Sequence, residues 1–154
     1  MRGQVQQVFI YILVIIVVGL IMLIGYGAIS DFIKQGDNIK LVNLQTDLEN
    51  FAERYTSYGT VKIEELIVPS GISEICFLNN SAYPEDIENK IIRQYASPDV
   101  EPMNVFLVGD ETIPFLKLEL VYPKDPNLKC ITAQSGKFYI QFEGKGSKVI
   151  VSGQ

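Results

Sequence analysis

The sequence predicts an α+β fold with a long N-terminal hydrophobic helix, an amphipathic helix, and then a mainly antiparallel β-sheet domain with one short helix. Three observations lead to this prediction. Residues 8–29 carry no charge, apolar residues recur at helical spacing over 41–55, and short strand-like segments separated by turn residues fill 60–154.

The uncharged segment runs from Val8 to Ile29. At about 1.5 Å per residue it makes a helix about 33 Å long, enough to cross a hydrocarbon core of about 30 Å. Tyr11 and Tyr26 lie near its ends, where aromatic rings tend to sit at the membrane interface. We therefore expect a signal or transmembrane helix over 1–30. The alternatives are a buried core helix and a secretory signal cleaved at Ala28-Ile29-Ser30.

The chain after Ser30 is acidic. It carries 12 basic and 18 acidic residues, which gives a net charge of 12 − 18 = −6. Nucleic-acid binding needs clustered Lys and Arg, and here the basic residues are scattered, so we expect no nucleic-acid partner. No polybasic run flanks the hydrophobic helix, so the helix itself is expected to contact the lipid bilayer.

A break in the helical structure is expected over Asp31–Asn38, which mixes charges with Gly36. A second helix should begin near Asp37 or Asn38, whose side chains can cap exposed amides, and cover about 38–57 before ending near Gly59. Its apolar face has a spacing of three or four residues and consists of Leu41, Leu44, Leu48, Phe51 and Tyr55. Two interpretations are open. The apolar face covers the core of its own domain, or the helix is a pilin-like extension of the membrane helix that packs onto the sheet and leaves its opposite face for neighbouring copies.

The β-rich part is expected over 60–154. Thr60–Val68 and Ile72–Leu78 are predicted to form a hairpin through Pro69-Ser70-Gly71. A short helix is predicted to open at Pro84, with an acidic first turn of Glu85 and Asp86, and to end at Ser97-Pro98. Its shared face would consist of Ile87, Ile91 and Tyr95.

Further strands follow. Val105–Val108 is apolar throughout and predicts a central strand, whereas Leu116–Tyr122 alternates and predicts a strand with one wet face. Three closing strands are predicted over Lys129–Ala133, Lys137–Phe142 and Lys148–Val151. Their turns would be Ser135-Gly136 and Gly144-Lys145-Gly146.

Cys76 and Cys130 are the only cysteines, and the chain has no His. They lack the close spacing of a zinc site, so we expect no metal and no cofactor. Either they form a disulfide or they stay buried thiols. In an oxidising exterior, a bridge closing a loop of about 54 residues stabilises by about 4 kcal/mol, and we favour the disulfide. Asn79-Asn80-Ser81 is a sequon that makes Asn79 a candidate N-glycosylation acceptor.

The chain is expected not to be an enzyme, and no catalytic residue is predicted. Without His, no Ser-His-Asp or Cys-His pair can form, and neither a P-loop nor a dinucleotide fingerprint is present. Glu64-Glu65 and Asp110-Glu111 are adjacent carboxylates. Neighbours on a strand point to opposite faces, so neither pair forms a natural acid and base.

The first residues, Met1-Arg2-Gly3-Gln4, followed at once by the apolar helix, resemble the class III signal of type IV pilins, especially archaeal ones. The resemblance implies peptidase cleavage between Gly3 and Gln4 and a helix that serves as membrane anchor and filament core. The fifth residue after that cut is Val8, where many archaeal pilins have Glu. The remainder resembles small uncharacterised membrane-anchored archaeal proteins through Tyr58–Lys62, Val68–Gly71, Cys76-Phe77 and Glu143–Gly146.

Two functional hypotheses follow. The first is a type IV pilin-like subunit of a cell-surface filament that self-associates through its N-terminal helix. The second is an uncleaved single-pass membrane protein that displays a β-rich binding or accessory domain. Lys34 and Lys40 outweigh Arg2 and favour a cytoplasmic domain. The pilin-like start, the cysteines and the sequon favour an extracytoplasmic domain over 31–154, and we adopt that orientation.

Overall fold

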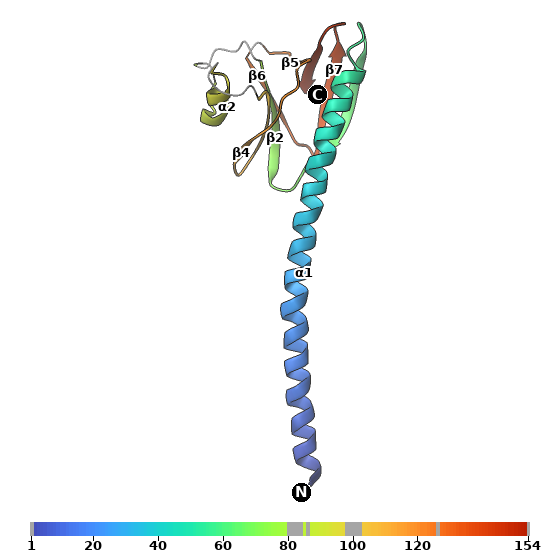
Figure 1. Ribbon diagram of the computed structural model, residues 1–154, viewed down its shortest axis with the longest axis vertical. Coiled ribbons are helices and arrows are strands. Elements are labelled where there is room, and N and C mark those ends of the chain that lie inside the picture. Colours follow the sequence, from blue (N-terminus) through green and yellow to red (C-terminus); the bar gives the residue numbers. More distant parts are fainter. Residues whose placement is uncertain (1, 80–84, 86, 98–102, 126, 154) are drawn as a thin grey trace. The chain divides into compact units, whose positions relative to one another are not determined.

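The computed structural model of the chain describes residues 2–79, 85, 87–97, 103–125 and 127–153. Residue contacts divide the chain into two compact units, Met1–Asn38 and Ile39–Gln154. The elements in chain order, several of which are labelled in Figure 1, are α1 (Arg2–Arg54), β1 (Val61–Ile67), β2 (Ile72–Leu78), α2 (Lys90–Tyr95), β3 (Val105–Gly109), β4 (Thr112–Leu116), β5 (Val121–Pro123), β6 (Leu128–Thr132), β7 (Lys137–Gly144) and β8 (Val149–Gly153). The predicted α+β class is confirmed.

Helix α1 is helical from Arg2 to Arg54, so the break predicted over Asp31–Asn38 is wrong and no helix begins at Asp37 or Asn38. The physical reason is local. Gly36 costs only about 1 kcal/mol relative to Ala inside a helix, and the Lys and Gln residues before it are good helix formers. A single glycine without a proline therefore does not end the helix.

The C-terminal part of α1, residues 39–54, has the apolar face that its spacing predicts. Leu44 and Leu48 are buried, Tyr55 just beyond the helix is buried as well, and Leu41 and Phe51 pack half-buried against the same core. The rings of Phe51 and Tyr55 lie 5.7 and 6.0 Å from that of Phe142 in β7. This face covers the core of its own domain.

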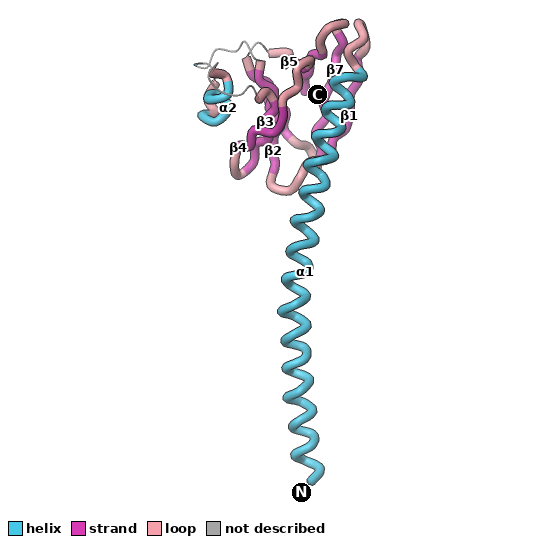
Figure 2. The backbone as a smooth tube through the Cα atoms, viewed as in Figure 1, coloured by secondary structure: helices cyan, strands magenta, loops and turns pink. Residues whose placement is uncertain are grey.

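The strands form two four-stranded sheets, which Figure 2 shows as the magenta tubes of the domain. Sheet A has the order β1-β7-β8-β5 and sheet B the order β4-β3-β2-β6. Every pairing is antiparallel except that of β5 with β8, which is parallel. The main core joins residues 39–54 of α1 to both sheets, and its largest fully buried members are Leu44, Leu48, Leu66, Ile75, Phe77, Leu107, Phe138 and Phe142.

The predicted hairpin of β1 with β2 is wrong. β1 pairs with β7, whereas β2 pairs with β3 and β6, so Pro69-Ser70-Gly71 connects two sheets. Ile75–Leu78 is buried on both faces, because a second apolar cluster that includes Ile92 of α2 covers the side of sheet B that faces away from the main core. A strand buried on both faces lies in the middle of its sheet and needs two partners.

Helix α2 begins later than predicted. The Asn89 side-chain oxygen accepts hydrogen bonds from the amides of Ile91 and Ile92 at 3.0 and 3.3 Å, which makes Asn89 the N-cap. The first turn contains no acidic residue. Of the predicted face, Ile87 and Tyr95 belong to one apolar cluster, whereas Ile91 is 39% exposed and Ile92 is the buried residue of the helix. Pro84, Asp86 and Pro98 lie outside the described residues.

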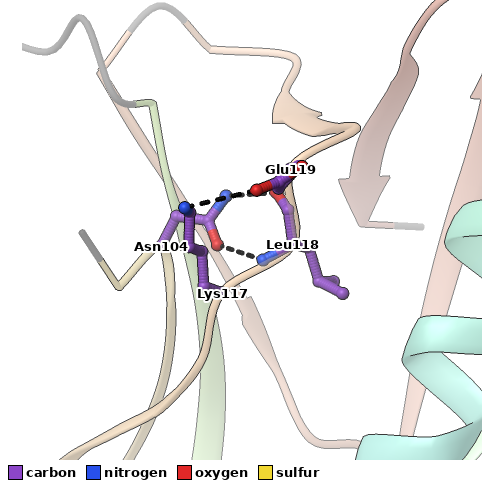
Figure 3. Close-up of polar contacts among 4 residues, drawn as sticks. All are labelled: Asn104, Lys117, Leu118 and Glu119. Carbon is purple, nitrogen blue, oxygen red and sulfur yellow. Dashed lines mark hydrogen bonds and ion pairs between the residues drawn. The ribbon is translucent and has the colours of Figure 1, made fainter. Parts of the chain in front are cut away.

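The strand predicted over Leu116–Tyr122 is wrong, because β4 ends at Leu116, residues 117–120 form a connection outside the sheets, and β5 begins at Val121. Figure 3 shows what holds the connection between them. The buried Asn104 side chain donates to the Leu118 carbonyl at 2.8 Å and accepts from the Leu118 amide at 2.7 Å. The backbone N–H and C=O of Leu118 have no partner strand, and the Asn104 side chain provides their hydrogen bonds instead.

The remaining strand predictions are confirmed. β3 lies between β2 and β4 in sheet B, as its apolar sequence predicts for a central strand. The three closing strands correspond to β6, β7 and β8. The turn at Ser135-Gly136 has φ angles of 52° and 76° and is closed by the Gln134 and Lys137 backbones, which suits a glycine in its second position.

Candidate functional site

The apolar segment of α1 is the most distinctive candidate for function. Val8–Tyr26 is a 19-residue span with a mean hydropathy of 3.2, long and apolar enough to cross a membrane. Its large hydrophobic side chains are 44–81% exposed within the chain. A signal sequence near an N-terminus has the same length and composition. Such a helix is stable in lipid, or packed against other apolar helices, because its backbone groups pair within the helix.

Gly3 and Gln4, the residues of the predicted peptidase cut, lie in the helical backbone of α1. Nothing in the fold tests whether the chain is cut between them, and the cleavage stays a prediction.

Cys76 and Cys130 form a disulfide, which decides between the two states that the sequence left open. The two residues lie opposite each other on the antiparallel strands β2 and β6, with Cα atoms 4.0 Å apart. Cys76 is buried and Cys130 is half-buried. The bridge ties together two strands that are distant along the chain.

A carboxylate lies beside this disulfide. An oxygen of Glu74 and the two sulfur atoms all lie within 4.8 Å of one another. The two sulfur atoms are bonded to each other in the disulfide, so neither is a thiolate that could bind a metal ion. Glu74, Glu88, Asn89 and the disulfide line a surface cavity of about 400 Å³. The Thr132 hydroxyl donates to Glu74 at 3.2 Å.

Asn79, the candidate glycosylation acceptor, follows directly after β2. Its backbone amide donates to the Asn127 carbonyl at 2.9 Å, and the residue is half-buried. Asn80 and Ser81, which complete the sequon, lie outside the described residues, so its glycosylation stays a prediction.

The adjacent carboxylates Glu64 and Glu65 point to opposite faces of β1, as expected of strand neighbours. Glu64 accepts a hydrogen bond from the Tyr55 hydroxyl, and Glu65 forms an ion pair with Lys137 at 2.5 Å. The hydrogen bond to Glu64, together with burial and the negative charge of Glu64, raises the pKa of Tyr55. Each carboxylate therefore has a structural partner.

Asp110 and Glu111 are exposed residues of the turn between β3 and β4, and not strand neighbours as the sequence predicted. The Gly109 amide donates to the Glu111 carbonyl at 3.0 Å. A Cβ at Gly109 would lie 1.8 Å from the Gly71 carbonyl oxygen, so only glycine fits here.

No protein-family model, no curated protein and no solved structure matches the chain. Its function must therefore be inferred from its own residues and geometry.

Sequence reasoning missed one exposed surface. Val61, Ile63 and Ile67 of β1 are 51%, 47% and 61% exposed, whereas Leu66 points into the core and is buried. The alternation of β1 was visible in the sequence, but both of its faces carry apolar residues. Only the folded structure, in which the core packs on the Leu66 side of β1, shows that the odd-numbered face is uncovered.

Proposed function

We propose that this chain is a non-enzymatic, membrane-anchored cell-surface protein and that it serves as a type IV pilin-like filament subunit. The observation that carries the proposal is helix α1. Its span Val8–Tyr26 exposes apolar side chains on every side, and its residues 39–54 present an amphipathic face that packs onto a β-rich domain. This arrangement supplies an anchor and a displayed domain in one chain.

The exposed apolar side chains of Val8–Tyr26 are unfavourable in water and are stabilised by contact with lipid or with other apolar helices. About 20 apolar residues suffice to cross a bilayer, and the same side chains can instead pack against identical helices of neighbouring copies. A Cβ added at Gly19 or Gly25 would meet no atom within 4 Å, so the helix surface at both glycines is open to close approach by another helix. In the proposal, this helix surface contacts lipid before the filament assembles and the helices of neighbouring copies afterwards.

The disulfide supports the exterior location of the domain. Disulfides persist in oxidising compartments and are rare where thiols are kept reduced. The Cys76–Cys130 disulfide joins strands β2 and β6 of sheet B. A domain with this bridge is suited to the cell surface.

A pair of matched variants in the native host tests the proposal. Gly3→Val should block the pilin-type cut, leave Met1-Arg2-Gly3 on the chain and abolish filaments that can be sheared from the cell surface. Ala28→Val is the matched control, because it alters the alternative signal site and should leave filaments unchanged. Filament yield and N-terminal sequence are the readouts. Filaments made by the Gly3→Val variant, or loss of the helix through a cut after Ser30, would overturn the proposal.

A further inference from the structure

A surface cavity of about 400 Å³ lies beside the Cys76–Cys130 disulfide, on the side of sheet B that faces away from the main core. Both cysteines line it, together with side chains from β2, β3, β6, α2 and the residues next to them. The disulfide is therefore in contact with a space that a small molecule can enter from solvent.

The two sulfur atoms of this disulfide differ in how well they can be reached. Cys76 is 1% exposed and lies on β2, which has a partner strand on each side, whereas Cys130 is half-buried and lies on β6 at an edge of sheet B. Thiol–disulfide exchange begins when a thiolate attacks one sulfur, and its rate depends on access to that sulfur. Access therefore favours attack at Cys130.

Two carboxylates place negative charge beside the disulfide. An oxygen of Glu74 lies within 4.8 Å of both sulfur atoms, and the Thr132 hydroxyl, opposite it on β6, donates to this carboxylate at 3.2 Å. Glu88 lines the same cavity. Among the described lining residues, these two acids are the charged ones, so an approaching thiolate meets like charge.

We propose that this cavity is a thiol-exchange site in which small thiols of neutral or positive charge form a mixed disulfide with Cys130. Glu74 determines the specificity of the site, because its carboxylate repels anionic thiols. The inference goes beyond the proposed function and does not depend on it, since it concerns only the disulfide and the cavity beside it.

The exchange proceeds in two balanced steps. The thiolate of the external thiol attacks Sγ of Cys130 and forms a new S–S bond, while the bond between the two cysteines breaks and its electron pair moves to Sγ of Cys76, which takes a proton from solvent. A second external thiolate then releases the first as a disulfide and leaves Cys130 as a thiol. The external thiol is the reductant, and an external disulfide reverses both steps as the oxidant.

Glu74 acts on the first step in two ways. It repels an anionic thiol as that thiol approaches, and it disfavours the negative charge that develops on the departing Cys76 sulfur. The second effect is the same for every thiol, whereas the first depends on the charge of the thiol. Comparing thiols of different charge therefore isolates the specificity that we assign to Glu74.

Reduction of the purified full chain by charged thiols in an uncharged detergent at low salt tests the specificity. Cysteamine carries a positive charge and 2-mercaptoethanesulfonate a negative one, and each rate is divided by the concentration of thiolate. Cysteamine should react about tenfold faster, and Glu74→Gln should lower this ratio to about threefold. Glu119→Gln is the matched control, because it removes the same charge from a side chain that is 78% exposed and does not line this cavity, and it should leave the ratio unchanged.

The site of attack is measured in the same reactions. Quenching with acid at early times and peptide mass spectrometry should find about tenfold more cysteamine on Cys130 than on Cys76. The reduction rate should rise in proportion to the thiol concentration, because the folded chain is attacked.

Three results would each overturn the inference. They are a mixed disulfide that forms mainly on Cys76, a charge ratio that Glu74→Gln leaves unchanged, and a rate independent of thiol concentration, which would mean that the bridge reacts only after unfolding. Filament yield from cells tests the proposed function separately.

Discussion

Asn104 is the residue on which the connection between β4 and β5 depends. Its side chain is 3% exposed and makes both of its hydrogen bonds to the backbone of Leu118. Asn104→Leu should lower the free energy of unfolding by about 3 kcal/mol, because it leaves a buried amide and a buried carbonyl without partners. Urea unfolding of the detergent-solubilised chain measures this change in the free energy of unfolding.

A matched control for this prediction is Asn50→Leu on the exposed side of α1, which should change stability by no more than about 0.5 kcal/mol. If the two variants lose equal stability, Asn104 does not hold the connection.

Tyr55 links the end of α1 to β1 through its hydrogen bond to Glu64. We expect this bond to make the domain less stable at alkaline pH. Its hydrogen bond to Glu64, burial and the Glu64 charge raise the pKa of Tyr55 above the usual 10.0. A pKa raised by folding gives stability that is fully present below pH of about 10 and is lost as the pH rises through the folded-state pKa.

Tyr55→Phe should therefore lower the free energy of unfolding by about 1 kcal/mol at pH 8, with a smaller difference from wild type above pH 11 or so. Unfolding curves of the two proteins at both pH values provide the comparison. A difference that stays the same at high pH would show that the hydroxyl does not contribute in this way.

At the scale of elements, the disulfide is the strongest link between strands that are distant along the chain. It closes a loop across a sequence separation of 54 residues. Cys76→Ala combined with Cys130→Ala should lower the free energy of unfolding by about 4 kcal/mol on the chain-entropy estimate. Dithiothreitol should have the same effect on wild type and none on the double variant. A reductant that leaves wild-type stability unchanged would argue against this role.

The elements show where sequence reasoning succeeded. Strong periodic patterns, such as the apolar face from Leu41 to Tyr55 and the central strand Val105–Val108, placed their elements correctly, because local burial dictates local pattern. The disulfide was also predicted, since two cysteines without His or other thiols leave few alternatives.

The errors have a different physical origin. The short turn at Pro69–Gly71 suggested a hairpin, but strand partners are chosen by which faces the whole fold buries, and β2 is buried on both. Asn104 holds the backbone beyond β4 through a contact 14 residues away in sequence, which no local pattern reveals. The short helix was predicted to open at Pro84, because proline and two acidic residues are typical of a helix start, whereas the side chain of Asn89 caps the helix in the fold.

For the whole molecule, the sequence indicated an apolar anchor and a separate β-rich domain, and the fold has both an apolar helix of spanning length and the β-rich domain. It did not indicate that Val61, Ile63 and Ile67 of β1 are exposed, because which face of a strand is covered depends on how the whole domain packs. The candidate processing site Gly3-Gln4 was predicted from the identity of the first residues, and its cleavage stays a prediction.

We propose that α1 serves as a pilin-type anchor and assembly helix. Intact mass and N-terminal sequencing of protein isolated from its native membrane test it most directly. Pilin-type processing predicts a mature chain that begins at Gln4 and keeps the whole apolar helix Val8–Tyr26. A mature chain that retains Met1-Arg2-Gly3 would contradict it.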